Sequence, residues 1–208
     1  FAACFIEAGW FVAAADGRRR PLLEVANFPL GLGGAARHNL ANGLAAIGLA
    51  LSLGLPDAAI AAGLAGFGGG PRDNPGRANL FEIGGVRLLV DFAHNPHGVA
   101  AILAMAAALP ARRRLVLLGQ AGDRSDGDIR DLAAAVAASR PDRVIVKEMD
   151  SYRRGRPTGE VPRLLTGALG DGGIAAASIG QAGSEIDAAR QALDWARPGD
   201  LLLLLSHD

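Results

Sequence analysis

The segment Asp91-Phe-Ala-His-Asn-Pro-His97 joins an apolar alternation to an alanine-rich stretch, so we expect it to connect a strand to a helix. Its polar side chains then stand at the carboxyl end of the strand, the edge where open α/β sheets bind ligands. Asn95 as a helix cap and Pro96 at the first helical position account for two of its residues. Asp91 is left to accept hydrogen bonds from ribose hydroxyls, and His94 to meet a phosphate or the substrate.

Charged residues fill a second expected strand-to-helix junction, Gly119-Gln-Ala-Gly-Asp-Arg-Ser-Asp126. Its glycines let the backbone approach a ligand closely, and Asp123 with Arg124 can bind a zwitterion or each other. The spacing does not fit the dinucleotide motif G-x-G-x-x-G. A plain Asp or Ser helix cap explains the segment equally well.

A third junction, residues 148–160, holds three arginines and three acidic residues around a glycine. Arg153, Arg154 and Arg156 could clamp a substrate carboxylate, and Glu160 could orient one of them or bind an amine. A solvated charged loop is the alternative, and it is favoured for this segment taken alone.

Three polar residues crowd one turn at the entry to a long expected helix. Asn39 and Asn42 are three residues apart and share a face, so their amides could read the edge of an adenine, while His38 could stack or touch a ribose. Helix capping by His38 and Asn39 is the alternative, and it is favoured on residue chemistry alone.

Arg77 follows a segment rich in glycine and proline, residues 66–76, which is typical of a linker between domains. An arginine at such a place can reach a phosphate once two domains close, because its planar fork offers several donors in fixed geometry. A solvated linker charge is the alternative.

Beyond the linker, expected strands alternate with expected helices, which predicts a doubly wound, mostly parallel α/β sheet. The first two strands, separated by Gly84-Gly85, are expected to form a hairpin. The expected strands are 80–83, 86–91, 114–119, 142–147, 174–179 and 200–205, and the expected helices are 97–109, 126–139, 160–169 and 184–196.

The first part of the chain is expected to be a smaller unit. Residues 1–30 predict a strand, a turn and a second strand ending near Phe28-Pro29, followed by a flexible loop at Gly31 to Gly34. A helix is predicted over residues 35–53, and a second begins at Pro56-Asp57 and ends before Gly66. We place the domain boundary at Gly76.

Composition narrows the function classes. Lys plus Arg equals Asp plus Glu at 21 each, which argues against a nucleic-acid or membrane surface. The single Cys4 excludes an internal disulfide framework, and with no Cys/His metal spacing the sequence assigns no metal ligand. We expect a cytoplasmic protein, and the sequence leaves open whether it forms a homo-oligomer. The chain opens in mid-pattern without a methionine, so we expect a fragment of a longer protein. It also lacks the phosphate-binding motif G-x-x-x-x-G-K-[ST].

Taken in order, these motifs resemble the Mur ligase family, the ATP-dependent ligases that join an amino acid to a carboxylate through an acyl phosphate. The pairing of Asn74-Pro-Gly-Arg77-x-Asn79 with Arg154-Gly-Arg156-x-x-Gly-Glu160 is most similar to the cyanophycin-synthetase branch. The resemblance implies that residues 1–76 are the end of a central ATPase domain. It also implies that residues 77–208 are a C-terminal, Rossmann-like domain.

The resemblance also implies roles for individual residues, with ATP and Mg²⁺ as cofactors and an amino acid or peptide as substrate. Arg77 and His94 become catalytic candidates, Arg77 at the phosphates and His94 at the nucleotide. Arg154 would meet the carboxylate of the incoming amino acid. The remaining implied residues are His38, Asn39 and Asn42 at the adenine, Asp91 at the ribose, and Asp123, Arg124, Arg156 and Glu160 as weaker candidates on the substrate side.

The family's phosphate-binding loop and metal-binding residues belong upstream of Phe1, so the resemblance implies that this piece is inactive alone. One alternative is a non-catalytic module that binds a nucleotide or an amino acid and has kept the fold. Another is a Rossmann-like interaction domain whose charged loops are only solvated.

Overall fold

The computed structural model describes residues 3–15, 17–68 and 70–207 and divides the chain into two compact units between Asn74 and Pro75. The division falls two residues before Gly76, where the sequence analysis places the boundary. The two units are described separately below. No helix among the described residues is long and apolar enough to cross a membrane.

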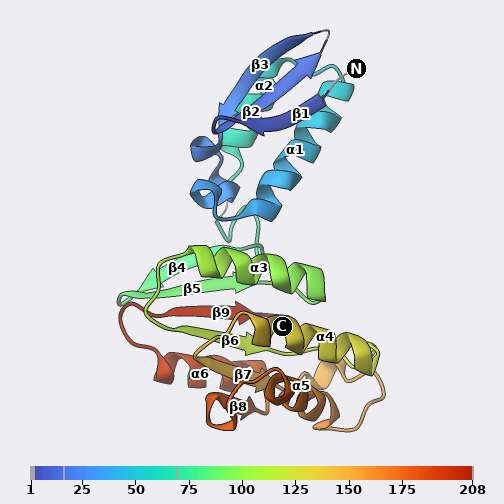
Figure 1. Ribbon diagram of the computed structural model, residues 1–208, viewed down its shortest axis with the longest axis vertical. Helices are drawn as coiled ribbons and strands as arrows, with labels where there is room; N and C mark the ends of the chain where they lie inside the picture. Colours follow the sequence, from blue (N-terminus) through green and yellow to red (C-terminus); the bar gives the residue numbers. More distant parts are fainter. Residues whose placement is uncertain (1–2, 16, 69, 208) are drawn as a thin grey trace. The chain divides into compact units, whose positions relative to one another are not determined.

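The N-terminal unit is an antiparallel sheet with two helices on one face (Figure 1). Its strands lie in the order β1-β2-β3, and its core joins Phe11 of β2 to Phe28 and to Ile47 of α1. The rings of Phe11 and Phe28 meet edge to face with centroids 5.4 Å apart. The elements are β1 (Ala3–Glu7), β2 (Trp10–Ala15), β3 (Arg18–Glu24), the 3-10 helices η1 (Val25–Asn27) and η2 (Pro29–Gly34), α1 (Arg37–Ser52) and α2 (Asp57–Gly66).

Two predictions for this unit are wrong. Residues 3–24 form three strands, because Ala8 and Gly9 take left-handed φ angles of 48° and 80° and turn the chain inside the first apolar run. The segment predicted as a flexible loop, Gly31 to Gly34, belongs to the 3-10 helix η2. The two long helices agree closely with their predicted ranges.

The C-terminal unit is built on a six-stranded sheet in the order β4-β5-β9-β6-β7-β8. Every neighbouring pair is parallel except β4 with β5, which confirms the predicted mostly parallel α/β fold. Gly84 and Gly85 both have positive φ, as a two-residue hairpin turn requires. The strands are β4 (Asn79–Ile83), β5 (Val86–Asp91), β6 (Arg114–Leu118), β7 (Arg143–Lys147), β8 (Ile179–Ala182) and β9 (Leu201–Leu205).

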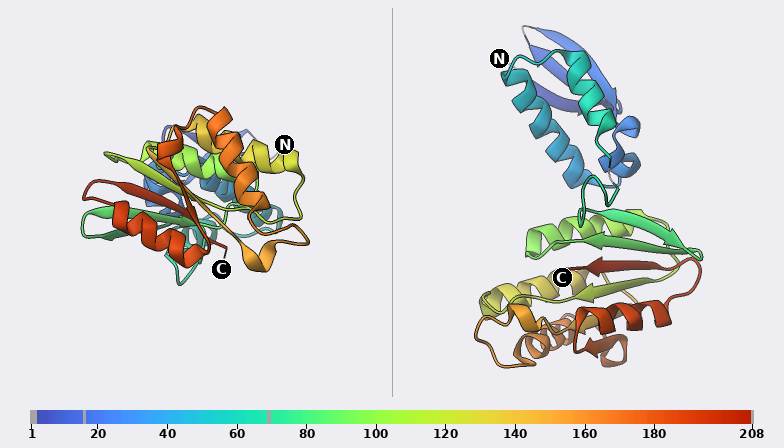
Figure 2. Two further views of the ribbon diagram at one scale, coloured as in Figure 1. Left: turned by 90° about the horizontal axis from the view of Figure 1, so that it is seen from below. Right: turned by 180° about the vertical axis from the view of Figure 1, so that it is seen from behind.

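Helices cover both faces of this sheet (Figure 2). Three of them pack side by side on one face: α3 (Pro96–Ala108), α4 (Asp126–Ala138) and α5 (Glu160–Asp171). On the other face, α6 (Glu185–Trp195) packs Ala188 and Ala192 against β6, β7 and β9. The chain reverses its winding direction after β8, and β9 returns to lie between β5 and β6. In doubly wound folds the crevice at such a reversal is where ligands bind.

The strand predicted at residues 174–179 is misplaced along the sequence, because β8 begins only at Ile179. Helix α5 runs two residues past its predicted end, and Gly173 then takes a φ of 89°. This turn lets the Ile174 amide donate to the carbonyl of Leu169 at 3.0 Å. The apolar start of the predicted strand therefore closes a helix, as C-terminal caps commonly do.

Candidate functional site

Four loops meet at the carboxyl edge of the C-terminal sheet, after β5, β6, β7 and β9. Gly122 donates its amide to the carbonyl of Tyr152 at 2.8 Å, which joins the loops after β6 and β7. The side chain of Gln120 donates to the carbonyl of His94 at 3.0 Å, and the Tyr152 hydroxyl donates to the carbonyl of His207 at 3.4 Å. The junctions singled out in this unit from the sequence therefore form one hydrogen-bonded edge.

Asp91 is a buried residue at the end of β5, and its carboxylate binds the backbone on both sides of the hairpin. One oxygen accepts the amide of Ala78 at 2.8 Å, and the other accepts the amide of Ala93 at 2.7 Å. Ala78 has a φ of 52°, an unusual angle for a residue with a side chain. Asp91 therefore shapes the loop in which its predicted ribose contact would be made.

Arg77 and His94 both contact the ring of Phe92. The Arg77 guanidinium is 5.8 Å from the centroid of the Phe92 ring, and the imidazole of His94 meets the same ring at 5.3 Å. His94 is fixed further by a 3.0 Å contact of Nδ1 with the Phe92 carbonyl. Arg77 itself is exposed. This pair is a positive charge and an imidazole presented together at the edge of the sheet.

The helix that follows begins as predicted. Asn95 accepts the amide of Gly98 at 2.9 Å through its side chain, and Pro96 occupies the first helical turn of α3. These contacts confirm the cap. His97 lies exposed in the same first turn.

Arg156 holds two loops together with its whole guanidinium. Nε donates to the carbonyl of Gly122 at 2.8 Å, and Nη2 to the carbonyl of Arg124 at 2.7 Å. Nη1 contacts the carboxylates of Asp126 at 2.8 Å and Glu160 at 2.6 Å. The hydrogen bond that Arg156 donates to Asp126, followed by the one that it donates to Glu160, raises the pKa of Arg156. In this arrangement the side chains of Arg156 and Glu160 bind other parts of the protein and hold the two loops together.

The neighbouring arginines are placed differently. Arg153 pairs with Asp150 at 3.2 Å and donates to the Thr158 hydroxyl at 2.7 Å. Arg154 is exposed, has a φ of 49°, and lies 5.5 Å from the centroid of the Tyr152 ring. Among the ion pairs of the described residues, none involves Arg154. Of these arginines, Arg154 offers its charge to a ligand.

In the loop after β6, Asp123 and Arg124 are exposed, and neither forms a salt bridge within the described part of the chain. Ser125 caps α4 by accepting the amide of Asp128 at 3.1 Å, and the Asp128 carboxylate accepts the Ser125 amide at 3.2 Å. The serine cap considered from the sequence is therefore present. It leaves the two charged residues before it free to face solvent.

The capping interpretation of the N-terminal unit's motif is wrong. Helix α1 is preceded by Ala36, without a side-chain cap, and His38 and Asn39 lie inside its first turn. The Asn39 amide instead donates to the carbonyl of Leu30 at 3.0 Å, which ties the helix to η2. Asn42 donates to the Asn39 side chain at 3.4 Å. The three residues do share one turn, as their spacing predicts.

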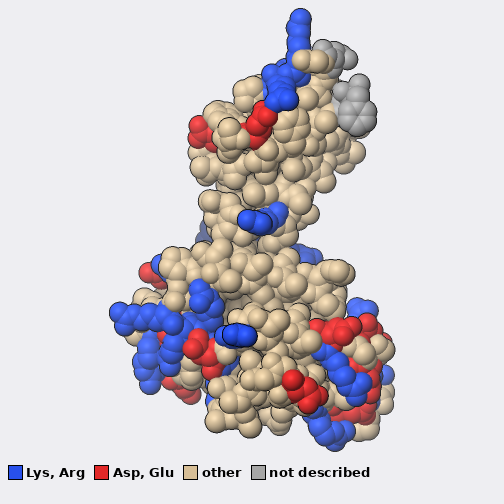
Figure 3. All heavy atoms as spheres, in the orientation of Figure 1, with Lys and Arg blue, Asp and Glu red and all other residues tan. Residues whose placement is uncertain are grey.

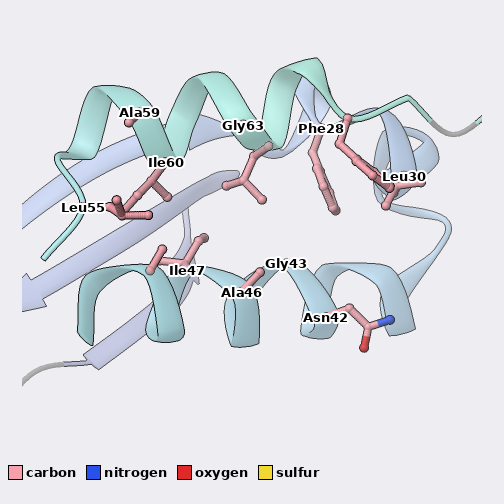
Figure 4. Close-up of a pocket in the computed structure, with 13 residues that line it drawn as sticks. Phe28, Leu30, Asn42, Gly43, Ala46, Ile47, Leu55, Ala59, Ile60 and Gly63 are labelled. Carbon is pink, nitrogen blue, oxygen red and sulfur yellow. The ribbon is translucent and has the colours of Figure 1, made fainter. Parts of the chain in front are cut away.

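Asn42 also lines a cavity of about 420 Å³ between α1 and α2. Figure 4 shows Ile47 and Ile60 facing each other across it, with Phe28 and Leu30 at one end. The lining is otherwise apolar. This cavity belongs to the N-terminal unit alone.

The sequence analysis missed a buried cluster at the carboxyl edge. Lys147 ends β7 and forms an ion pair with Glu185, and Glu185 accepts hydrogen bonds from the Ser206 hydroxyl and the His207 amide. One signal was available. Lys147 is the only lysine in a chain that otherwise uses arginine for its basic residues.

Charged side chains gather on the C-terminal unit, as the face drawn in Figure 3 shows, whereas the N-terminal unit is mostly uncharged there. No group of three or more His, Cys, Asp or Glu side chains among the described residues could hold a metal ion. The described residues thus supply cations for an anionic ligand but no set of metal ligands.

Comparisons with known proteins agree with this arrangement. The family profile described as "Mur ligase, glutamate ligase domain" matches residues 76–207. The chain is 39% identical over 142 residues to cyanophycin synthetase from Crocosphaera subtropica, covering 68% of this chain and 16% of that protein. It is 33% identical over 149 residues to UDP-N-acetylmuramate--L-alanine ligase from Acidithiobacillus ferrooxidans, covering 69% and 30%.

Solved structures share the fold at low identity. E. coli FolC in complex with DHPP and ADP superposes with a TM-score of 0.69 at 20% identity, over 96% of this chain and 41% of that one. MurF from Acinetobacter baumannii superposes with a TM-score of 0.62 at 18% identity, over 98% and 40%. The chain thus spans well under half of the proteins it matches. Its profile match and its relatives establish that it belongs to the Mur ligase family.

Proposed function

We propose that this chain is the C-terminal part of an ATP-dependent ligase that joins an amino group to a carboxylate. The observation that carries the proposal is the presentation of two exposed arginines, Arg77 and Arg154, at the carboxyl edge of one Rossmann-like sheet. The names of the relatives support it, since they are a synthetase and amino-acid ligases, and FolC has been solved with ADP.

The chemistry suits these side chains. The acceptor carboxylate attacks the terminal phosphorus of ATP and ADP leaves, and the amine then attacks the acyl carbon and expels phosphate. Both steps gather negative charge on oxygen, which preorganised cationic donors stabilise. In the proposal Arg77 contacts the transferred phosphate, His94 lies beside it, and Arg154 binds the carboxylate of the incoming amino acid.

The remaining candidate residues are assigned to the nucleotide or to the substrate side. Asp91 can accept a ribose hydroxyl only with lone pairs that its two backbone hydrogen bonds leave available. Asp123 and Arg124 are placed on the substrate side, and His38, Asn39 and Asn42 are assigned to the adenine. No group of three or more metal-ligating side chains occurs among the described residues, so no step is assigned to a metal held by them alone.

The test uses the full-length protein that contains this chain, with ADP release measured against ATP and amino-acid concentration. We expect Arg77→Ala to lower kcat about a hundredfold, the usual cost of losing one donor to a developing charge. We expect Arg154→Ala to raise the KM for the amino acid about tenfold or more, because a charge-assisted contact is lost. Arg163→Ala, an exposed arginine of α5, is the matched control and should leave both constants unchanged.

Unchanged kinetics in both Arg77→Ala and Arg154→Ala would overturn these assignments. A full-length protein that binds nucleotide but releases no ADP with any amino acid would instead favour the non-catalytic binding module.

A further inference from the structure

Lys147 stands apart from the other basic residues of the chain. It is the only lysine among 21 basic residues, and its side chain has 0% of its surface exposed. Its ammonium donates to the carbonyl of Leu205 at 2.9 Å and pairs with Glu185. An ammonium is a compact charge with three donors, whereas a guanidinium is larger and planar. The position is thus one where arginine could not replace lysine without rearrangement.

The loop after β6 is shaped around this side chain. A Cβ added to Gly119 would lie 2.6 Å from Cε and 2.7 Å from Cγ of Lys147. Contacts this short do not occur, so only glycine fits beside the lysine. Lys147 therefore contacts the ends of β6 and β9 as well as its own strand.

Glu185 links Lys147 to Ser206 and His207. It occupies the first turn of α6, where the helix dipole favours a negative charge. Burial raises its pKa, but hydrogen bonds from Lys147, Ser206 and His207 outweigh this and hold the pKa of Glu185 below its ordinary value. The His207 amide donates to it at 3.0 Å. An ionised Glu185 thus fixes the backbone at residues 206–207.

The His207 ring is neutral and packed. Burial and the charge of Lys147 lower the pKa of His207 to about 4, and His94 adds to the effect, while Glu185 and the Ala93 backbone oppose it. Neither ring nitrogen has a hydrogen-bond partner of ordinary geometry within the described residues.

The ring centroid of His207 lies 5.2 Å from that of Phe92, the ring that also contacts Arg77 and His94. The ring packing thus runs from the end of β9 to the two predicted catalytic side chains.

We propose that Lys147 is a positioning residue which, through Glu185, holds His207 against Phe92 and thereby fixes Arg77 and His94. A buried ion pair of this kind seldom contributes much net stability, because desolvation of both charges offsets their attraction. The Lys147–Glu185 ion pair instead contributes a fixed arrangement of the side chains around it. The kinetic consequence rests on the proposed function, whereas the structural one does not.

The structural arm uses NMR on the 208-residue chain. The double variant Lys147→Met with Glu185→Leu removes both charges together, so it leaves no buried charge unpaired and should stay folded. We expect the pKa of His207 to rise from about 4 toward the ordinary histidine value, because the ring is released from its packed position and the charge of Lys147 is removed. Variant His207→Phe identifies its signal among four histidines. A folded double variant whose His207 pKa stays near 4 would overturn the proposal.

The matched control is the ion pair Arg113–Asp200, which joins the residue before β6 to the residue before β9 at the opposite edge of the same sheet. Replacing it with Met and Leu should lower the melting temperature and leave the pKa of His207 unchanged. Equal movement of the His207 pKa in both double variants would show a general loosening of the sheet and would overturn the positioning role.

The kinetic arm uses the full-length enzyme. The Lys147→Met/Glu185→Leu variant should raise the KM for ATP about tenfold, since Arg77 loses its fixed support, and the Arg113/Asp200 control should not. Unchanged KM and kcat in a folded variant would count against the proposal. An inactive wild-type enzyme would refute the proposed function instead, and the NMR result would still decide the positioning role.

Discussion

The Nε atom of Arg156 donates a 2.8 Å hydrogen bond to the carbonyl of Gly122, a residue 34 positions earlier in the chain. With its contacts to Arg124, Asp126 and Glu160, this bond makes one side chain responsible for the mutual placement of two loops at the edge of the sheet.

Replacing Arg156 with alanine should impair the proposed ligase activity more than it destabilises the fold. The loops that carry Arg124 and Arg154 lose their common support, and a displacement of about 1 Å can cost about a hundredfold in rate. The measurement is kcat/KM for the amino acid beside a thermal melt. Arg130→Ala, which removes only a 3.9 Å ion pair on α4, should change neither.

Substituting Gly119 with alanine should destabilise the C-terminal unit by about 1–3 kcal/mol, the usual cost of overpacking. The new Cβ would press on Lys147 and lie 3.0 Å from the Met149 sulfur. Urea unfolding measures the change. Gly167→Ala is the control, because that helical position has open space, and it should stabilise by about 0.5–1 kcal/mol.

Asp200 should make stability fall at acid pH. Burial raises its pKa, but hydrogen bonds from Arg113 and the Arg197 amide outweigh this and lower the pKa of Asp200. Its stabilising contribution is therefore complete above its unfolded pKa of about 3.9 and is lost as pH falls through the lower folded value. In urea melts between pH 2 and pH 5, Asp200→Asn should flatten this dependence. A wild-type and a variant curve of equal slope would contradict the prediction.

Protonation of His207 should also make stability depend on pH, in a different pH range from Asp200. Its folded pKa is about 4, against about 6.5 when unfolded, so the unfolded chain binds more protons between these values. Stability should therefore decline as pH falls from about 6.5 to about 4. The variant His207→Phe keeps an aromatic ring against Phe92 and should remove this part of the decline. Its measurement is the difference in unfolding free energy between the two proteins at pH 7 and pH 4.5.

Most of the C-terminal fold could be predicted from the sequence because strands such as β5 and β6 are short apolar runs, each followed by a helix with its own start signal, Asn95-Pro96 or Ser125. The position of β8 could not, because Gly173 and Ile174 look like the start of a strand but close helix α5, and β8 begins only at Ile179. In the N-terminal unit the turn at Ala8-Gly9 was hidden in an apolar run.

The candidate site was predictable to the level of loops but not of single side chains. The loops could be predicted because each of them follows a strand, and the carboxyl ends of parallel strands lie at one edge of the sheet. Residue type and spacing alone do not separate Arg156, which is engaged within the protein, from Arg154, which is exposed, because the left-handed backbone at Arg154 and Gly155 follows no periodicity. Only the family resemblance ranks Arg154 above Arg156. Lys147 was overlooked because the three residues before it, 144–146, are apolar, so it looks like the end of a buried strand.

The contacts around Asp91 also define where the C-terminal unit begins. The amide of Phe92 donates to the carbonyl of Gly76 at 2.9 Å, and the Gly76 amide donates to the Asn79 side chain at 2.8 Å. Together with the Asp91 bond to Ala78, they anchor the chain to the C-terminal sheet from Gly76 onward. Both chain neighbours of Arg77 are therefore bound within the C-terminal unit, so the backbone that carries its guanidinium belongs to that unit and not to a loose linker.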